Sequence, residues 1–297
     1  MKIARVFPRR TAQSPDDVLA FFDDPPELFP PQVDEVHVSV AFTYDIPEAE
    51  RLAKAWAHIA PVKIGGPAFG KPSGDFVPGR HVKQGITFTS RGCPNRCWFC
   101  SVHKREPKLI ELPIMPGYII QDDNLLACSR PHIEAVFTML EAQEQRVMFL
   151  GGLESRLLEP WHMERLRTLN PGSIYFAYDT ADDLEPLRYA GELLYEYGFG
   201  WPCRVPRCFV LIGYKGDTFE AAERRFHETI AAGFWPLAML WKDKDGNENK
   251  EWRKFSRIWA RPAIYFQEAM TIHYGANNGQ WTRSKMGNCE NALFPVL

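Results

Sequence analysis

From residue 85 onward the chain alternates short apolar runs with longer segments of helical periodicity. Strands separated by helices pair in parallel, so this order predicts repeated strand–helix units. We predict six strands, at residues 85–89, 118–121, 146–150, 173–178, 208–213 and 236–241. The helices predicted between them span residues 132–145, 159–169, 184–197 and 219–232.

The N-terminal third shows a smaller version of the same pattern. Residues 1–7, 36–42 and 62–64 are β-type apolar runs, and residues 48–59 carry apolar positions at helical spacing. Residues 8–32 are rich in Pro and Asp, which predicts a connection without regular structure. The first 70 or so residues therefore predict a small α/β layer.

Composition is that of an ordinary soluble protein. The 297 residues are 45% hydrophobic and 24% charged, and the net charge is −2. This balance gives no general electrostatic case for a nucleic acid or an anionic membrane partner. No apolar run reaches the ~18 residues of a membrane span, and no signal segment is recognisable, so we expect a cytoplasmic protein without a membrane partner.

Three cysteines are crowded into one short loop after the strand predicted at residues 85–89. Cys93, Cys97 and Cys100 form the spacing C-x3-C-x2-C. Three thiolates can hold three irons of a cubane iron–sulfur cluster and leave the fourth iron open to a ligand. His103 extends the run to a Cys3His set, so a tetrahedral zinc site is the alternative. A disulfide is disfavoured, because seven cysteines without a signal segment indicate a reducing compartment.

The same spacing, with the aromatic Phe99 just before the last cysteine, resembles the motif of the radical S-adenosylmethionine (radical SAM) superfamily. The resemblance implies a 4Fe-4S cluster whose open iron is chelated by the amino and carboxylate groups of S-adenosylmethionine. An external electron donor reduces the cluster, and reductive cleavage of the sulfonium yields a 5'-deoxyadenosyl radical that abstracts a substrate hydrogen. Phe99 is then the first candidate for contact with the adenine.

The resemblance also implies an architecture. Six units match the partial (β/α)6 TIM-like barrel of this superfamily, which we assign to residues 81–242, followed by a C-terminal extension at 243–297. This large parallel α/β scaffold weakens the zinc alternative, because a small zinc module would not need such a scaffold. Residues 1–80 resemble a truncated, Rossmann-like cobalamin-binding domain. They lack the D-x-H-x-x-G signature of a cobalamin ligand, so we do not expect bound cobalamin.

In parallel α/β folds the ligand lies at the carboxyl ends of the strands. A polar cluster follows the strand predicted at 118–121, where the family binds the methionine ammonium group; a helix N-cap is the alternative. Gly151, Gly152 and Glu154 follow the next strand and resemble the family's Gly-Gly-Glu motif, displaced by one strand and interrupted by Leu153, or form only a turn. The polar cluster after the strand at 118–121 comprises Gln121, Asp122, Asp123 and Asn124, and of these Asp122 or Asp123 is the first candidate for the ammonium group.

Two later strand ends supply weaker candidates. Asp179 is placed to accept hydrogen bonds from ribose hydroxyls, and Gly213 lies on a strand that resembles the one along the adenine. Residues 65–71 spell G-x4-G-K, but Pro72 supplies no hydroxyl for magnesium, so a phosphate-binding loop is excluded.

The remaining cysteines bear on the choice of subfamily. A second cluster is conceivable, but these cysteines lack the tight spacing of a ligand loop; they are Cys128, Cys203, Cys208 and Cys289. No cysteine precedes Cys93, which argues against the methylthiotransferases of the superfamily.

The C-terminal segment combines aromatic and basic residues. A helix predicted at 251–260 has Trp252, Phe255 and Trp259 on one face, with Arg253 and Arg257 on the other. Together with Trp281, Arg283 and Lys285 it could stack on single-stranded nucleic acid. We favour an amphipathic helix docked on the scaffold. The substrate class stays open among a small molecule, a nucleotide and a nucleic-acid base.

Overall fold

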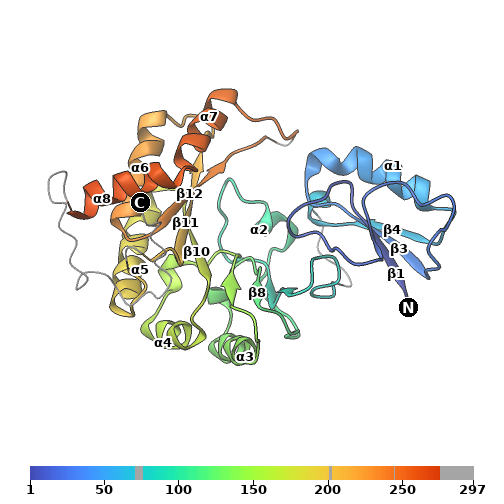
Figure 1. Ribbon diagram of the computed structural model, residues 1–297, viewed down its shortest axis with the longest axis horizontal. Helices are drawn as coiled ribbons and strands as arrows, with labels where there is room; N and C mark the ends of the chain where they lie inside the picture. Colours follow the sequence, from blue (N-terminus) through green and yellow to red (C-terminus); the bar gives the residue numbers. More distant parts are fainter. Residues whose placement is uncertain (71–75, 201–202, 244, 275–297) are drawn as a thin grey trace. The chain divides into compact units, whose positions relative to one another are not determined.

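A computed structural model of the chain describes residues 1–70, 76–200, 203–243 and 245–274. It divides into two compact units. The first comprises Met1–Gly117 with Asp243–Asn247, and the second comprises Tyr118–Lys242 with the described residues from Glu248 onward (Figure 1). The division at residues 80 and 242 stays a prediction. None of the helices among the described residues is long and apolar enough to cross a membrane.

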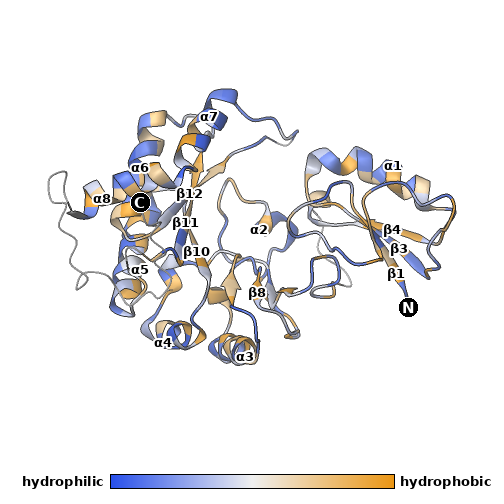
Figure 2. Ribbon diagram, in the orientation of Figure 1, coloured by the Kyte–Doolittle hydropathy of each residue, from blue (hydrophilic) through white to orange (hydrophobic). Residues whose placement is uncertain are grey.

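The first unit contains a parallel sheet in the order β2-β1-β3-β4. Its strands are β1 (Ile3–Val6), β2 (Ala20–Phe21), β3 (Glu35–Ser39) and β4 (Val62–Gly65). The helix α1 (Ile46–Trp56) begins with a proline in its first turn, where the missing N–H costs nothing. Leu52 and Trp56 of α1 pack with alternate residues of β3 into one buried cluster. In Figure 2 hydrophobic and hydrophilic residues alternate along α1.

The strand β2 corrects the prediction that residues 8–32 are only a connection. Ala20 pairs with Arg5 of β1, and the Phe21 ring lies 4.7 Å from the Trp56 ring. The Trp56 indole N–H also donates to the Asp23 carbonyl at 3.0 Å. This short strand is fixed by tertiary contacts that local composition does not reveal.

The rest of the first unit is built from short elements. They are β5 (Ile86–Thr87), β6 (Ser90–Arg91), α2 (Val102–Arg105) and β7 (Ile110–Glu111). The strand predicted at 85–89 is confirmed as β5. The antiparallel pair of β6 and β7 was not predicted.

The second unit confirms the predicted alternation of strands and helices. Its strands are β8 (Ile119–Ile120), β9 (Met148–Phe149), β10 (Ser173–Tyr178), β11 (Pro206–Ile212) and β12 (Trp235–Leu240). They pair in parallel in the order β12-β11-β10-β9-β8. The helices are α3 (Arg130–Glu141), α4 (Pro160–Leu169), α5 (Leu184–Glu196), α6 (Phe219–Ala231), α7 (Lys250–Trp259) and α8 (Pro262–Tyr274).

The chain is thus a mixed α/β protein with parallel sheets, as predicted. These pairings establish the sheets and not a barrel, so the (β/α)6 barrel stays a prediction. The helix predicted at 132–145 ends earlier, at Glu141, and α8 was not predicted. Trp259 stacks on Phe226 of α6 with the ring centroids 4.4 Å apart, which fixes α7 to the scaffold.

Candidate functional site

The cysteine loop of the first unit is closed at its base by the two short strands β6 and β7. Arg91 pairs with Ile110, so residues 92–109 form a loop whose two ends are held together. Gly92 follows Arg91 with φ at +87°, and a Cβ atom there would lie 2.2 Å from the Lys108 carbonyl oxygen. Only glycine fits this turn. The three cysteines therefore lie in a loop whose ends are held by the β6–β7 pair and by the turn at Gly92.

Cys93, Cys97 and Cys100 are partly exposed and form no disulfide. The Cys100 N–H donates to the Cys97 carbonyl at 3.1 Å, which makes a turn between these two positions. The Val102 N–H lies 3.5 Å from the Cys100 sulfur, and such a donor stabilises a thiolate. The Cys100 sulfur therefore has a backbone donor in place.

The three cysteine side chains do not meet at one position that would suit a metal ion. Among the described residues, no three His, Cys, Asp or Glu side chains converge in a way that could hold a metal ion. The donor chemistry nevertheless fits a cluster, because three thiols share one loop with closed ends. A cluster held by all three sulfurs would require the cysteine side chains to rotate. His103 lies in α2, and its Nδ1 atom is buried without a hydrogen-bond partner.

The two aromatic residues of the loop differ in exposure. Phe99 is half-buried, whereas Trp98 is 58% exposed. Their rings are perpendicular, with centroids 5.4 Å apart. Behind the loop, the buried guanidinium of Arg91 lies over the Phe76 ring at 4.6 Å. The loop thus has a packed inner side and an exposed side that carries Trp98.

In the second unit, the end of β8 carries buried polar groups. Asp122 and Asn124 are only 2% and 3% exposed, and Asp123 is half-buried. Asn124 precedes the short 3-10 helix Leu125–Ala127 but makes no capping hydrogen bond, so the N-cap alternative is not what the structure shows. Gln121, which the sequence places in the polar cluster but not among the candidate ligands, has a buried Oε1 atom without a hydrogen-bond partner. Such an orphaned acceptor is costly unless a ligand supplies a donor.

The two glycines after β9 have different roles. A Cβ atom at Gly151 would lie 2.1 Å from the backbone oxygen of Asp122, so Gly151 is required for the close approach of the β8 and β9 ends. At Gly152, no heavy atom lies within 4 Å of the position that a Cβ atom would take. Gly152 therefore leaves its backbone open to a ligand, and Gly151 serves packing.

Glu154 belongs to a network at the ends of β9 and β10. Arg156 bridges Glu154 and Asp183, with N–O distances of 3.1 and 2.9 Å. The second oxygen of Asp183 accepts the backbone N–H groups of Asp179 and Thr180 at 3.0 and 2.8 Å. Arg156 and these N–H groups thereby balance the charges of two carboxylates.

The carboxylate of Asp179, which follows β10, is only partly hydrogen-bonded. Its Oδ1 atom is buried without a hydrogen-bond partner. Burial, together with the nearby charge of Asp183, raises the pKa of Asp179 to about 7, although the Leu211 N–H and Arg225 oppose the shift. A buried carboxyl group with a pKa near neutrality at a strand end is a candidate ligand-binding group.

Gly213 directly follows β11 and has φ at +76°. Its N–H donates to the Asp217 carboxylate at 2.9 Å. Asp217 in turn pairs with Arg225 of α6 at 2.9 Å, and both side chains are buried. A Cβ atom at Gly213 would lie 2.9 Å from the Trp252 ring. The sequence interpretation missed Asp217 and Arg225, because a buried ion pair leaves no spacing signal.

Three of the four remaining cysteines and two aromatic residues of α7 are buried. Cys128, Cys203 and Cys208 are buried, and Cys289 lies outside the described residues. Trp252 and Trp259 are 8% and 6% exposed, as expected for an amphipathic helix docked on the scaffold. Three further candidates, Trp281, Arg283 and Lys285, also lie outside the described residues.

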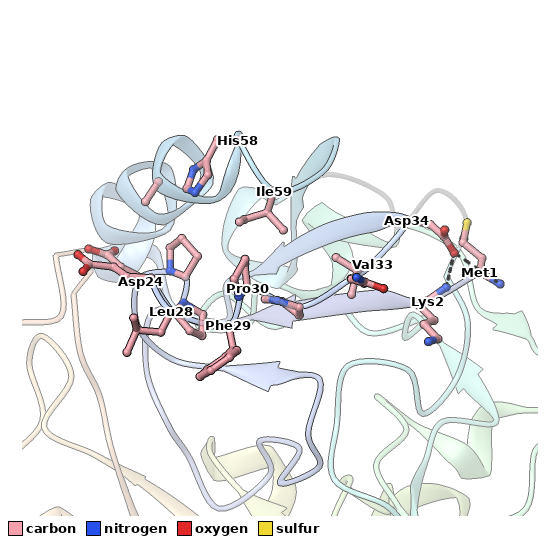
Figure 3. A pocket seen from close by; sticks show the side chains of 16 residues that line it. Met1, Lys2, Asp24, Leu28, Phe29, Pro30, Val33, Asp34, His58 and Ile59 are labelled. Atoms are coloured by element: carbon pink, nitrogen blue, oxygen red, sulfur yellow. Dashed lines mark hydrogen bonds and ion pairs between the residues drawn. The ribbon is translucent and has the colours of Figure 1, made fainter.

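An open hollow of about 1420 Å³ lies at the amino ends of β1 and β3 (Figure 3). A proline-rich segment, residues 25–31, lines it together with the end of α1, and Lys2 and Asp34 are joined there by a hydrogen bond. Ligands of parallel sheets bind at the opposite, carboxyl edge. The hollow is therefore not our candidate site.

No protein-family model and no curated protein sequence matches the chain. Its fold is similar to solved structures of TsrM from Kitasatospora setae, described as a radical S-adenosylmethionine methyltransferase. The likeness is one of fold. One TsrM structure, with cobalamin and a [4Fe-4S] cluster bound, has a TM-score of 0.53 and 12% identity over 70% of this chain. Another, with tryptophan substrate and the analogue aza-SAM bound, has a TM-score of 0.50 and 13% identity over 71%.

The chain spans 63% and 62% of the length of those two TsrM structures. At this level of identity the likeness concerns the fold alone. The ligands and the substrate of this chain have to be argued from its own residues.

Proposed function

We propose that the protein is a radical SAM enzyme that binds a 4Fe-4S cluster through Cys93, Cys97 and Cys100 and cleaves S-adenosylmethionine reductively. The observation that carries this proposal is the C-x3-C-x2-C loop, closed by β6 and β7. The likeness of the fold to that of TsrM supports it. When bound, the cluster supplies the electron that cleaves the sulfonium. The product radical abstracts hydrogen from a substrate that is a small molecule, a nucleotide or a nucleic-acid base.

The second unit supplies the acceptors that S-adenosylmethionine needs. Its ammonium group and ribose hydroxyls are hydrogen-bond donors, and the strand ends carry buried acceptors without partners, Gln121 Oε1 and Asp179 Oδ1. A carboxylate strengthens a hydrogen bond to an ammonium group or a hydroxyl. We assign Asp122 and Gln121 to the ammonium group and Asp179 to the ribose, with Gly152 open for the approach of the ligand.

TsrM is described as a methyltransferase with cobalamin bound, which raises the question of cobalamin here. In the first unit, the loop after β1 carries Arg9, which donates to both oxygens of Asp45 at 2.9 and 2.7 Å. Asp45 is 8% exposed and follows β3. This ion pair occupies the carboxyl edge of the small sheet. We therefore propose radical chemistry without cobalamin, which predicts that incubation with hydroxocobalamin and gel filtration leaves no cobalamin absorbance with the protein.

Zinc on Cys93, Cys97, Cys100 and His103 in a non-catalytic binding protein is the second candidate. The observation that favours it is the buried Nδ1 atom of His103 without a partner. Metal analysis of anaerobically purified variants separates the two. We expect His103→Ala to keep about four irons per chain after reconstitution and Cys97→Ala to lose the cluster. Cys128→Ala, a buried cysteine in the second unit, is the matched control and should bind iron as the wild type does. Zinc retained by the wild type and lost in His103→Ala would reverse the assignment.

A further inference from the structure

The outer face of α7 is basic, although the chain as a whole carries a net charge of −2. Its basic residues stand at the spacing i, i+3, i+4 and i+7, which places them on one side of a helix, and all are exposed. Glu251 is the single acidic residue of α7, and hydrophilic residues predominate along this helix (Figure 2). The basic set, which we call the α7 face, consists of Lys250, Arg253, Lys254 and Arg257.

The opposite side of α7 is fixed to the scaffold by aromatic residues. Trp252 and Trp259 are buried, and Phe255 packs with them in the same hydrophobic cluster. The Trp252 ring lies 4.4 Å from the Phe219 ring of α6. Because the aromatic and basic sets occupy different sides of one helix, this packing turns the four basic side chains outward.

The positive charge of the α7 face is only partly neutralised. Arg253 pairs with Glu248, and Lys254 pairs with Glu251. The side chains of the second pair are 71% and 63% exposed, so water screens this pair strongly. The other two basic residues of the face form no ion pair within the described part of the chain. Exposed charges of one sign attract a partner of the opposite sign.

The composition of the α7 face distinguishes among anionic partners. A membrane holds an amphipathic helix by its apolar side, and here that side is buried. Protein interfaces need apolar anchors, whereas this face presents ammonium and guanidinium groups. Ile258 is 46% exposed but lies outside the basic spacing. Nucleic-acid interfaces are polar and strongly basic on the protein side, which matches the α7 face.

The burial of the aromatic rings also decides between single and double strands. Proteins bind single strands with rings on which the bases stack, and the Trp252 and Trp259 rings are buried instead. The phosphates of a duplex can be contacted without stacking. Lys250 and Arg257 are separated by about 10 Å along the helix axis, which corresponds to about three phosphates on one strand of a duplex.

We propose that the α7 face binds the phosphate backbone of a double-stranded nucleic acid without reading its sequence. The inference goes beyond the proposed function and does not depend on the cluster. Trp252 lies against Gly213, which follows β11, so α7 begins at the carboxyl edge of the second sheet. A bound duplex would therefore lie on the same unit as the residues assigned to S-adenosylmethionine.

The test measures binding of the full chain to a short DNA duplex, and to an RNA duplex of the same sequence, by fluorescence anisotropy over a range of salt concentrations. Lys250→Glu/Lys254→Glu/Arg257→Glu should bind at least about tenfold more weakly than the wild type. Lys250→Gln/Lys254→Gln/Arg257→Gln removes the charges without reversing them, and its dependence of log Kd on log salt should be shallower by about three units. Arg253 is left in place because it pairs with Glu248.

The matched control changes two lysines and one arginine that are exposed on other elements. Lys54→Glu/Lys108→Glu/Arg167→Glu alters the net charge by the same amount, and its affinity for either duplex should fall by no more than about twofold. Circular dichroism establishes that each variant is folded. Binding of both duplexes locates the contact on the shared phosphate backbone, and binding of one assigns the source.

Equal duplex binding by the wild type and both α7 variants would overturn the inference. So would a wild type that binds a single strand more tightly than the duplex of the same length, because that would require stacking rings. Wild-type binding to phosphatidylserine vesicles or to polyglutamate, without binding to either duplex, would reassign the face to a membrane or an acidic protein and also overturn it. Cleavage of S-adenosylmethionine with dithionite should be the same in the α7 variants and the wild type, so its absence would contradict the proposed function instead.

Discussion

The two parallel sheets of the molecule have different chemistry at their carboxyl edges. In the first unit, Arg9 after β1 and Asp45 after β3 satisfy each other through two hydrogen bonds. In the second unit, Gln121 after β8 and Asp179 after β10 keep buried oxygens without a partner. At the first edge the two charged groups pair with each other, whereas at the second edge two buried acceptor oxygens have no donor.

This difference shows that topology alone does not locate a ligand. Both sheets are parallel, and both would place a ligand at the carboxyl edge by the general rule. Buried polar atoms are almost always paired in folded proteins, so orphaned acceptors identify the edge that needs a ligand. We therefore assign the S-adenosylmethionine-binding residues to the second sheet. The predictions below test this contrast.

The largest effect is expected at the junction of β8 and β9. Gly151→Ala would place a methyl group 2.1 Å from the Asp122 carbonyl oxygen, and we expect the free energy of unfolding to fall by about 3 kcal/mol. Gly152→Ala is the matched control, because nothing lies within 4 Å of its Cβ position, and it should change stability by less than about 0.5 kcal/mol. Urea denaturation followed by circular dichroism measures both. Equal stability of the two variants would mean that the strand ends do not meet as described.

The next effect concerns Asp179 and depends on pH. Its pKa is raised to about 7 in the folded protein, whereas an unfolded aspartate titrates near about 3.9. The folded state therefore holds the proton more tightly, and the contribution of Asp179 to stability falls as pH rises between these two values. We expect Asp179→Asn to be more stable than the wild type at pH 8, on the order of 2 kcal/mol, with little difference at pH 4.

The same variant should bind S-adenosylmethionine less well, because the amide is a weaker acceptor than the carboxylate. Calorimetric titration at pH 8 would show the loss of affinity beside the gain in stability. If Asp179→Asn is destabilised at pH 8, or if its affinity for S-adenosylmethionine is unchanged, Asp179 is a structural residue and the ribose assignment is wrong.

The smallest effect is expected at the edge of the first sheet. Arg9→Ala leaves the carboxylate of Asp45 without its partner, and we expect a loss of about 1 kcal/mol because Arg9 itself is half-exposed. Arg9→Ala/Asp45→Ala should recover part of this loss in chemical denaturation. Hydroxocobalamin binding gained by Arg9→Ala would show that the ion pair, and not only the missing D-x-H-x-x-G signature, keeps cobalamin from this edge.

Much of the fold could be predicted from the sequence, because periodicity reports burial directly. The strand predicted at residues 173–178 is found at these residues as β10, and the helix predicted at 159–169 is found as α4. Three of the missed elements, β2, β6 and β7, are two residues long and depend on tertiary pairing. Strands this short leave no periodic pattern.

The candidate site was predictable only in part. The cysteine spacing indicates its chemistry in the sequence, since metal ligands must lie close together in space. Gln121 belongs to the polar cluster visible in the sequence, but its orphaned oxygen is seen only in the structure. The pair of Asp217 with Arg225 left no such signal, because its importance arises from burial and pairing. The roles of Gly151 and Gly152 likewise separate only when the neighbouring backbone is known.

The central claim is tested most directly by S-adenosylmethionine cleavage. The protein is reconstituted anaerobically with iron and sulfide, mixed with dithionite and S-adenosylmethionine, and assayed for 5'-deoxyadenosine. The account predicts cluster-dependent product in the wild type, product in Cys128→Ala, and none in Cys97→Ala. A wild-type protein that retains zinc and gives no 5'-deoxyadenosine would contradict it.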